Sequence, residues 1–172
     1  IASCLVGSEM CIRDSISSDM TQLAYTGNYA FASRAPRSWL HPTGYGTLGY
    51  GLPAGIGGML ATDHRPGLVL VGDGGFLYTA QELATAVEEL DRPLVVLLWN
   101  NDALGQIRDD MLGLDIEPVG VLPRNPDFVG LARAFGCAVR QPRDLDALQA
   151  DLAIGFATPG VTFIELKHTC VR

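Results

Sequence analysis

The sequence LVLVGDGG at residues 68–75 and the sequence LVVLLWNND at residues 94–102 decide the fold of this chain. Each begins with an uninterrupted apolar run and ends in turn-forming residues, which is typical of a strand buried on both faces of a sheet. The residues between the runs have a helical pattern from about residue 79 to residue 90. This order predicts two parallel strands joined by a right-handed crossover. The polar residues after both strands are therefore expected at one edge of the sheet, where open α/β sheets bind their ligands.

The residue types at these two strand ends indicate a site for a metal ion and phosphate. Asp73 offers a carboxylate oxygen and Asn101 an amide oxygen, and both suit Mg2+ together with phosphate oxygens. The glycines beside Asp73 let the backbone approach a ligand closely and leave N–H groups free to donate. The alternative is two ordinary turns rich in Gly, Asn and Asp, and either turn alone favours it. The occurrence of both turns on neighbouring strands favours one site divided between them.

The same stretch resembles a known motif. Gly72-Asp73-Gly74, the helix and strand that follow, and Asn100-Asn101 are similar to the cofactor motif of thiamine diphosphate enzymes. The most similar group is the superfamily of acetolactate synthases and 2-oxo acid decarboxylases, and the similarity extends from about residue 19 to residue 167. The resemblance implies the C-terminal domain of a three-domain subunit, which is the domain that holds the diphosphate.

The order of the elements predicts an α/β fold with an open parallel sheet and helices on both faces, similar to a Rossmann fold. Residues 16–172 are expected to form this thiamine diphosphate-binding domain, as a fragment of a larger subunit. Residues 1–15 do not resemble the family and are expected to be a non-native or disordered leader. Predicted helices at 127–135 and 144–157 and predicted strands at 137–140 and 161–166 complete the scaffold.

The resemblance also implies which residues hold the cofactor. Mg2+ is expected on Asp73, Asn101 and the backbone carbonyl of Ala103, and thiamine diphosphate is the expected organic cofactor. Gly46 would offer its carbonyl to the aminopyrimidine, and Leu48 would press between the two cofactor rings. The full set of expected cofactor-binding residues is Thr26, Gly27, Asn28, Gly46, Leu48, Asp73, Gly74, Gly75, Asn101, Ala103, Leu104, Gly105 and Gln106.

Residues 23–25 are predicted to form a short strand that ends in the polar turn at residues 26–29. A glycine with small polar neighbours after a strand can hold phosphate oxygens, and in related enzymes this segment touches the diphosphate. Those enzymes carry Gln-His where this sequence has Asn28-Tyr29. The alternative is a simple turn from a strand into a helix.

Gly44-x-Gly46-x-x-Gly49 matches the fingerprint of a dinucleotide-binding loop. Its context argues against that function, because residues 38–42 are not a convincing strand. Asp63 lies in a turn, whereas the acid that binds a ribose ends the second strand. A dinucleotide-binding oxidoreductase domain is therefore kept as the alternative from another class, and a non-catalytic remnant domain is a third.

The resemblance implies a lyase or transferase that acts on a 2-oxo acid. Residues 44–53 and 97–107 most resemble 5-guanidino-2-oxopentanoate decarboxylases, and acetolactate synthase-like carboligases are the alternative. The glutamate that activates the aminopyrimidine is expected from the pyrimidine-binding domain of a second subunit. No catalytic residue is therefore assigned in this fragment, and the fragment alone is expected to be inactive. The full-length enzyme is expected to be a homodimer or homotetramer, and the sequence leaves open whether it also binds FAD.

The composition excludes several other classes of function. The 172 residues are enough for one domain with a sizeable core, and the net charge of −7 argues against a general nucleic-acid binder. No apolar stretch approaches the length that a membrane span needs. Cys4, Cys11, Cys137 and Cys170 form no CxxC pair, so free thiols in a cytoplasmic protein are expected.

Overall fold

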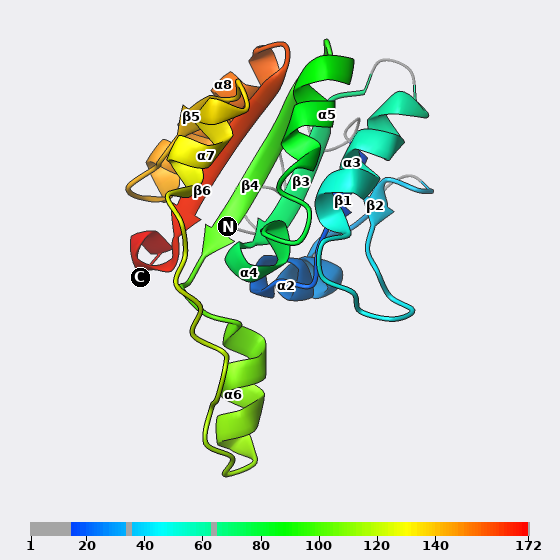
Figure 1. Ribbon diagram of the computed structural model, residues 1–172. Coiled ribbons are helices and arrows are strands. Elements are labelled where there is room, and N and C mark those ends of the chain that lie inside the picture. Colours follow the sequence, from blue (N-terminus) through cyan, green and yellow to red (C-terminus); the bar gives the residue numbers. More distant parts are fainter. Residues whose placement is uncertain (1–14, 34–35, 63–64, 172) are drawn as a thin grey trace.

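A computed structural model describes residues 15–33, 36–62 and 65–171 of the chain. Its centre is a parallel six-stranded sheet in the order β2-β1-β3-β4-β6-β5 (Figure 1). The strands are β1 (Ser15–Ser18), β2 (Trp39–Leu40), β3 (Gly67–Gly72), β4 (Leu94–Asn100), β5 (Ala138–Arg140) and β6 (Val161–Lys167). The helices are α2 (Gln22–Ala30), α3 (Gly51–Leu60), α4 (Asp73–Phe76), α5 (Glu82–Glu89), α6 (Gly105–Gly113), α7 (Phe128–Ala134), α8 (Leu145–Ala157) and the 3-10 helix η2 (His168–Val171).

The two predicted central strands are β3 and β4, and they pair in parallel from Gly67↔Leu94 to Gly72↔Trp99. Side chains of a strand alternate between the two faces of a sheet. Both faces are buried here, which is why these strands are continuously apolar. The prediction of two adjacent parallel strands, each buried on both sides, is confirmed.

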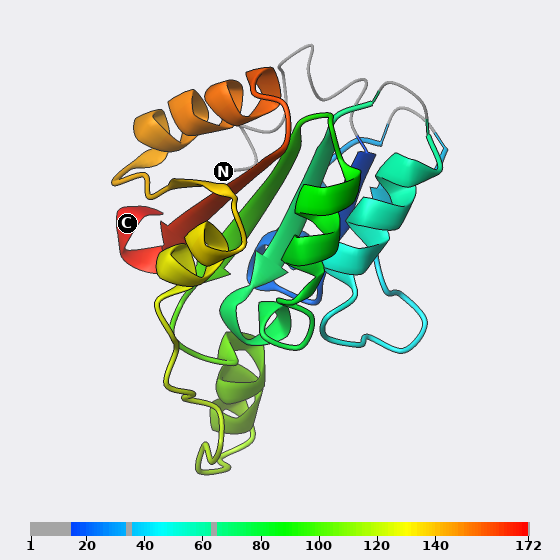
Figure 2. The same cartoon turned by 45° about the horizontal axis from the view of Figure 1, so that its top comes forward.

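Helices cover both faces of the sheet, as predicted (Figure 2). Apolar residues of α3, α5 and α7 pack against one face, and residues of α8 pack against the other, with Leu23 of α2 beside them. Asp127 and Asp144 cap α7 and α8 by accepting hydrogen bonds from the N–H groups of Gly130 and Ala147. The predicted C-terminal scaffold is therefore confirmed with small shifts of its boundaries. None of the helices in the described ranges is both long and apolar enough to cross a membrane.

The carboxyl ends of β3 and β4 lie at the same edge of the sheet. Asp73 starts α4 directly after β3, and a short turn leads from β4 into α6. Figure 1 shows α4, the start of α6 and α2 gathered at this edge, while the rest of α6 extends away from the sheet. The fold therefore brings the two polar turns together.

The predicted strand at residues 23–25 is wrong, because these residues belong to helix α2. Thr21 occupies the N-cap position with an extended backbone, and good helix formers such as Gln22, Leu23 and Ala24 follow it. The strand of this region is β1, which lies earlier in the chain and includes Ser15, a residue that the sequence analysis excluded. The rest of the expected leader, residues 1–14 with Cys4 and Cys11, lies outside the described residues.

Strand β1 escaped prediction because three of its four residues are serines. The serines are buried, and the hydroxyl groups of Ser17 and Ser18 have hydrogen-bonding partners. Ser17 Oγ donates to the carbonyl of Gly51 at 2.7 Å, and Ser18 Oγ lies 2.8 Å from His41 Nδ1. A buried polar strand costs little when its hydroxyls are satisfied in this way.

Residues 38–42 contain β2, a strand of two residues at the edge of the sheet. The loop with the Gly44-x-Gly46-x-x-Gly49 pattern follows this edge strand, whereas the phosphate loop of a dinucleotide fold follows a central strand. The topology therefore gives no support to the dinucleotide-binding alternative.

Gly55 and Gly57 of α3 provide a test of how this helix packs against the sheet. A Cβ atom at Gly55 would lie 2.5 Å from Val69 Cγ2 and 2.6 Å from Ser17 Oγ, whereas a Cβ at Gly57 would meet no atom within 4 Å. Gly55→Ala is expected to lower the free energy of unfolding by about 1–3 kcal/mol through overpacking. Gly57→Ala should raise it by about 0.5–1 kcal/mol through helix propensity. Urea denaturation measures both, and equal effects of the two substitutions would contradict the packing of α3 against the sheet.

Candidate functional site

A cavity of about 70 Å3 opens at the carboxyl edge of β3 and β4. Most of the residues expected from the sequence to bind a cofactor line it, and they come from three separate segments of the chain. The expected residues at the cavity are Leu48, Asp73, Gly74, Gly75, Asn101, Ala103, Leu104, Gly105 and Gln106. The cavity therefore unites the two polar turns and the start of α6, as the sequence analysis expected.

Asp73 is the buried carboxylate of this cavity, with an exposed fraction of 2%. Its Oδ1 accepts a hydrogen bond from the N–H of Gly74 at 2.8 Å, and its Oδ2 accepts one from Asn125 Nδ2 at 2.8 Å. Burial nevertheless raises the pKa of Asp73 above its ordinary value, because desolvation outweighs these hydrogen bonds. Within the described ranges no Lys, Arg or His side chain lines the cavity. A bound cation would supply the missing positive charge.

The turn after β4 places Asn101 beside Ala103. Asp102 at the centre of the turn has φ +55°, a left-handed conformation that Asp and Asn tolerate better than most residues. Asn101 Oδ1 accepts a hydrogen bond from the N–H of Ala103 at 3.3 Å. On the preceding residue, Asn100 Nδ2 donates to Glu165 Oε1 at 2.7 Å, and Asn100 Oδ1 accepts from the N–H of Asp102 at 3.1 Å. Asn100 therefore anchors the turn to β6.

Helix α6 begins at the cavity with unused backbone donors. No side chain caps its N-terminus at Leu104, and the first N–H groups of a helix have no partner within the helix. These N–H groups and the helix dipole favour an anion at this place. The glycines pack closely here, since a Cβ at Gly105 would lie 2.5 Å from Asn101 Nδ2 and one at Gly74 would lie 2.6 Å from Leu104 Cδ2, so a larger residue would displace these side chains.

The oxygen atoms of Asp73, Asn101 and Ala103 suit Mg2+, and the N–H groups of α6 suit a phosphate group beside it. A carboxylate, an amide oxygen and a backbone carbonyl are hard oxygen ligands, and Mg2+ commonly completes its shell with phosphate oxygens and water. The described part of the chain contains no group of three His, Cys, Asp or Glu residues that could hold a metal. A metal at this edge would therefore depend on Asp73 together with the uncharged oxygens of Asn101 and Ala103.

Four expected residues do not lie at the cavity. Thr26 and Gly27 line a different, apolar cavity, and Asn28 Oδ1 accepts a hydrogen bond from Trp39 Nε1 at 2.9 Å. The prediction placed these three residues at the cavity because it took their segment for the end of a strand, whereas the segment is the helix α2. Gly46 lies in the loop between β2 and α3 with φ +68° and does not line the cavity.

The structure adds residues that the sequence analysis missed. Met20, Thr21, Gln22 and Tyr25 line the cavity from the start of α2, and Trp99 lines it from β4. Thr21 at the N-cap position, followed by helix formers, was the signal that could have revealed this helix start. Asn125, which holds the Asp73 carboxylate, had no local signal because it is distant in sequence.

Asp19 positions the loop that carries Leu48. Its buried carboxylate follows β1 and accepts hydrogen bonds from the N–H groups of Gly49 at 2.9 Å and Tyr50 at 3.3 Å. Burial raises the pKa of Asp19, against the effect of these N–H groups and of His41. Gly49 has φ +82°, and its carbonyl accepts a hydrogen bond from Thr79 Oγ1 at 3.1 Å. The loop is therefore held from both sides, with Leu48 at the cavity.

Asp19→Ala is expected to lower the free energy of unfolding by about 1–3 kcal/mol, because the buried N–H of Gly49 and the partly buried N–H of Tyr50 lose their acceptor. Urea denaturation measures this loss. Asp91→Ala is the control, since the Asp91 side chain is 96% exposed and its removal should change stability by less than about 0.5 kcal/mol. Equal stability of both variants would show that Asp19 does not anchor the loop.

Comparison with known proteins agrees with this geometry. The family model for the thiamine pyrophosphate enzyme, C-terminal TPP binding domain, matches residues 19–166. The chain is 83% identical over 157 residues to the "Probable 2-ketoarginine decarboxylase AruI" of Pseudomonas aeruginosa, covering 91% of this chain and 28% of that protein.

More distant relatives are acetolactate synthases. The chain is 37% identical over 124 residues to the "Probable acetolactate synthase large subunit" of Methanocaldococcus jannaschii, covering 70% of this chain and 21% of that protein. It is 33% identical over 162 residues to the acetolactate synthase isozyme 1 large subunit of Escherichia coli K12, covering 91% of this chain and 28% of that protein. The chain thus spans less than a third of these relatives. The chain belongs to the thiamine diphosphate (thiamine pyrophosphate) enzyme family and corresponds to its C-terminal cofactor-binding domain.

Proposed function

We propose that this chain is the diphosphate-binding domain of a larger subunit, a thiamine diphosphate- and Mg2+-dependent decarboxylase that acts on 2-ketoarginine (5-guanidino-2-oxopentanoate). The identity of 83% to the Pseudomonas aeruginosa protein supports this substrate. The observation that carries the proposal is the cavity at the ends of β3 and β4. It combines the Asp73 carboxylate with uncharged oxygen ligands and the uncapped start of α6, without a basic side chain among the described residues that line it.

The charges explain why a metal ion belongs to the proposal. A diphosphate beside the Asp73 carboxylate would bring negative charges together in a partly buried place, which is unfavourable unless a cation lies between them. Asp73, Asn101 and the carbonyl of Ala103 would hold Mg2+, and the first N–H groups of α6 would donate to phosphate oxygens. Gly105 and Gln106 lie at this helix start and line the cavity.

Thiamine diphosphate supplies the nucleophilic carbon and the electron sink on which the decarboxylation of a 2-oxo acid depends. The task of this domain is to hold that cofactor and to fix its orientation. Leu48 contributes to the second task because its half-buried side chain lines the cavity from the loop that Asp19 anchors. Its partial exposure supports a contact with the cofactor more than a role in the core.

The remaining parts of the catalytic site are proposed to come from outside this domain. The cavity of about 70 Å3 is much smaller than the roughly 300–1,000 Å3 of a typical small-molecule site, so it would enclose only part of the cofactor. Helix α6 and the segment after it expose large apolar side chains, as expected of a surface that another domain covers. These side chains belong to Ile107, Leu112, Leu114, Ile116, Val119 and Leu122.

We therefore propose that the pyrimidine-binding domain of a second subunit covers this surface and contributes the activating glutamate. The complete enzyme would then be a homodimer or homotetramer, and this chain alone would be inactive. Cys137 and Cys170 are free thiols, which supports a reducing compartment such as the cytoplasm.

A second candidate function is that of an acetolactate synthase-like carboligase, because relatives with 37% and 33% identity carry that name. The products distinguish the two activities. Both activities release CO2 from a 2-oxo acid, but a decarboxylase releases the remainder as an aldehyde, whereas a carboligase joins it to a second carbonyl compound. Incubation of the complete subunit with 2-ketoarginine or with pyruvate, followed by product analysis, separates them.

Asp73→Ala in the complete subunit should abolish Mg2+-dependent binding of thiamine diphosphate and the release of CO2 from 2-ketoarginine. The physical reason is the loss of the carboxylate that offsets the charge of the ion. Isothermal titration calorimetry with and without Mg2+ measures the binding, and Asp146→Asn on the exposed surface of α8 is the matched control. Unchanged cofactor affinity of Asp73→Ala would refute the assignment of the metal site.

Leu48→Ala in the same subunit should lower kcat more than it weakens cofactor binding, because the substitution disturbs geometry at the reacting atoms. Steady-state kinetics, cofactor titration and thermal unfolding are measured together. If Leu48 were a core residue, the substitution would instead cost about 2–5 kcal/mol of stability. A large loss of Tm with wild-type kcat in the folded fraction would therefore rule out the role at the cofactor.

A further inference from the structure

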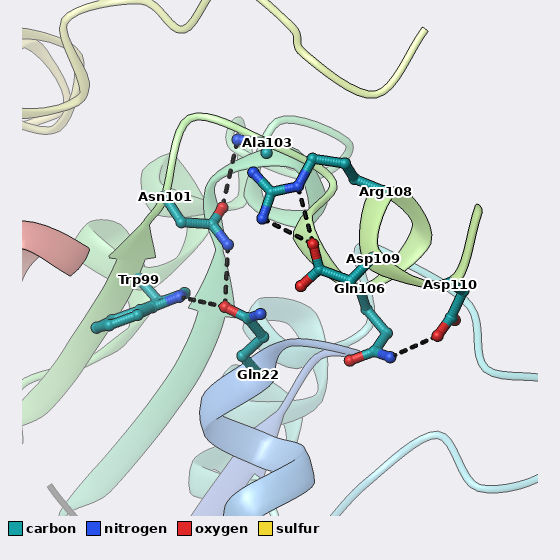
Figure 3. Close-up of polar contacts among 8 residues, drawn as sticks. All are labelled: Gln22, Trp99, Asn101, Ala103, Gln106, Arg108, Asp109 and Asp110. Atoms are coloured by element: carbon teal, nitrogen blue, oxygen red, sulfur yellow. Dashed lines mark hydrogen bonds and ion pairs between the residues drawn. The ribbon is translucent and has the colours of Figure 1, made fainter. Parts of the chain in front are cut away.

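Gln22 is the first residue of α2, and its side chain reaches the turn after β4. Its Oε1 accepts two hydrogen bonds, one from Trp99 Nε1 at 3.1 Å and one from Asn101 Nδ2 at 3.0 Å (Figure 3). Gln22 therefore connects a side chain of the sheet with the proposed metal ligand Asn101, although about 80 positions of sequence separate Gln22 from both.

The direction of these hydrogen bonds is fixed by Trp99. An indole N–H can only donate, so the side of the Gln22 amide that faces Trp99 must be its oxygen. That oxygen also faces Asn101 and can only accept, so the side of the Asn101 amide that faces Gln22 must be its NH2 group. The Asn101 oxygen is then left on the side of Ala103, where it accepts the N–H of Ala103 at 3.3 Å.

The reverse orientation of the Asn101 amide is unfavourable at both ends. Its oxygen would face the oxygen of Gln22, and its NH2 group would face the N–H of Ala103. The contact with Gln22 is the shorter of the two contacts that fix the amide, 3.0 Å against 3.3 Å. An NH2 group directed at a cation would repel it, so this orientation decides whether Asn101 can act as a metal ligand.

The surroundings keep the three side chains in place. Trp99 is 8% exposed and belongs to the apolar cluster between the sheet and α8. Gly105 leaves the necessary space, because a Cβ there would lie 2.5 Å from Asn101 Nδ2 and 3.4 Å from Gln22 Nε2. The orientation thus originates in a rigid element of the core.

We propose that Gln22 is a positioning residue for the metal site, which transmits the orientation set by the Trp99 indole to the Asn101 amide and so presents the Asn101 oxygen to Mg2+. This inference rests on the proposed function, since it assumes the metal at Asp73, Asn101 and Ala103. Residues that orient metal ligands typically change metal affinity by about 10- to 100-fold when they are replaced.

The test measures Mn2+ affinity of the complete subunit in the presence of thiamine diphosphate, by electron paramagnetic resonance of free Mn2+, together with Tm. Gln22→Met removes the acceptor at similar length and is expected to weaken Mn2+ binding by about 10-fold or more. Gln22→Glu keeps an oxygen acceptor for both donors and is expected to restore affinity to within about threefold of wild type. The changes in Mn2+ affinity of the two variants should not correlate with their changes in Tm.

Trp99→Phe tests the origin of the orientation, because it removes the indole N–H and leaves Gln22 in place. It is expected to weaken Mn2+ binding by several-fold. Trp39→Phe is the matched control, since Trp39 Nε1 also donates to an amide oxygen of α2, that of Asn28 at 2.9 Å, away from the cavity. That variant is expected to bind Mn2+ like wild type.

The outcomes separate the two proposals. If the wild type binds Mn2+ with thiamine diphosphate and both Gln22→Met and Trp99→Phe bind equally well, the positioning role is overturned and the proposed function stands. If Gln22→Met weakens binding but Gln22→Glu does not restore it and Trp99→Phe has no effect, the positioning role is likewise overturned. If the wild type itself does not bind Mn2+ with thiamine diphosphate, both proposals fail.

Discussion

The parallel pairing of β3 with β4 is the constraint on which the site depends. Because the two strands run in the same direction with a register from Gly67↔Leu94 to Gly72↔Trp99, both of their carboxyl ends reach one edge of the sheet. The buried apolar side chains on both faces hold that register through close packing, since a slip of one residue would place side chains of the wrong shape against the helices. The packing of the core thereby determines how close Asp73 and Asn101 come to each other.

Burial of a carboxylate at the site costs free energy. Asp73 is buried, its pKa is raised by desolvation, and the cavity contains no basic side chain among the described residues. Asn125 and the N–H of Gly74 offset part of this cost through hydrogen bonds. The part of this cost that the hydrogen bonds do not offset would favour the binding of a cation beside Asp73. Polar side chains around it, such as Gln22 and Asn100, hold the neighbouring turn in one conformation.

The sequence was sufficient to predict the elements that carry a strong periodic or capping signal. β3, β4, β6 and the helices α7 and α8 belong to this group, and so do the cavity residues that directly follow β3 and β4. Prediction failed at residues 15–30, where a serine-rich buried strand lacks the apolar pattern and a helix start was interpreted as a strand. Thr26, Gly27 and Asn28 were misplaced for this reason, and Gln22 was overlooked. Contacts such as Asn125 with Asp73 join positions far apart in sequence, which local patterns do not reveal.

In the proposed site, one metal ion joins the ends of β3 and β4 to a diphosphate. The most direct measurement is anomalous X-ray scattering from crystals of the complete subunit grown with thiamine diphosphate and Mn2+. An anomalous peak is expected between the side-chain oxygens of Asp73 and Asn101 and the carbonyl of Ala103, next to the diphosphate. A cofactor bound elsewhere, or a peak that none of these three oxygens contacts, would contradict it.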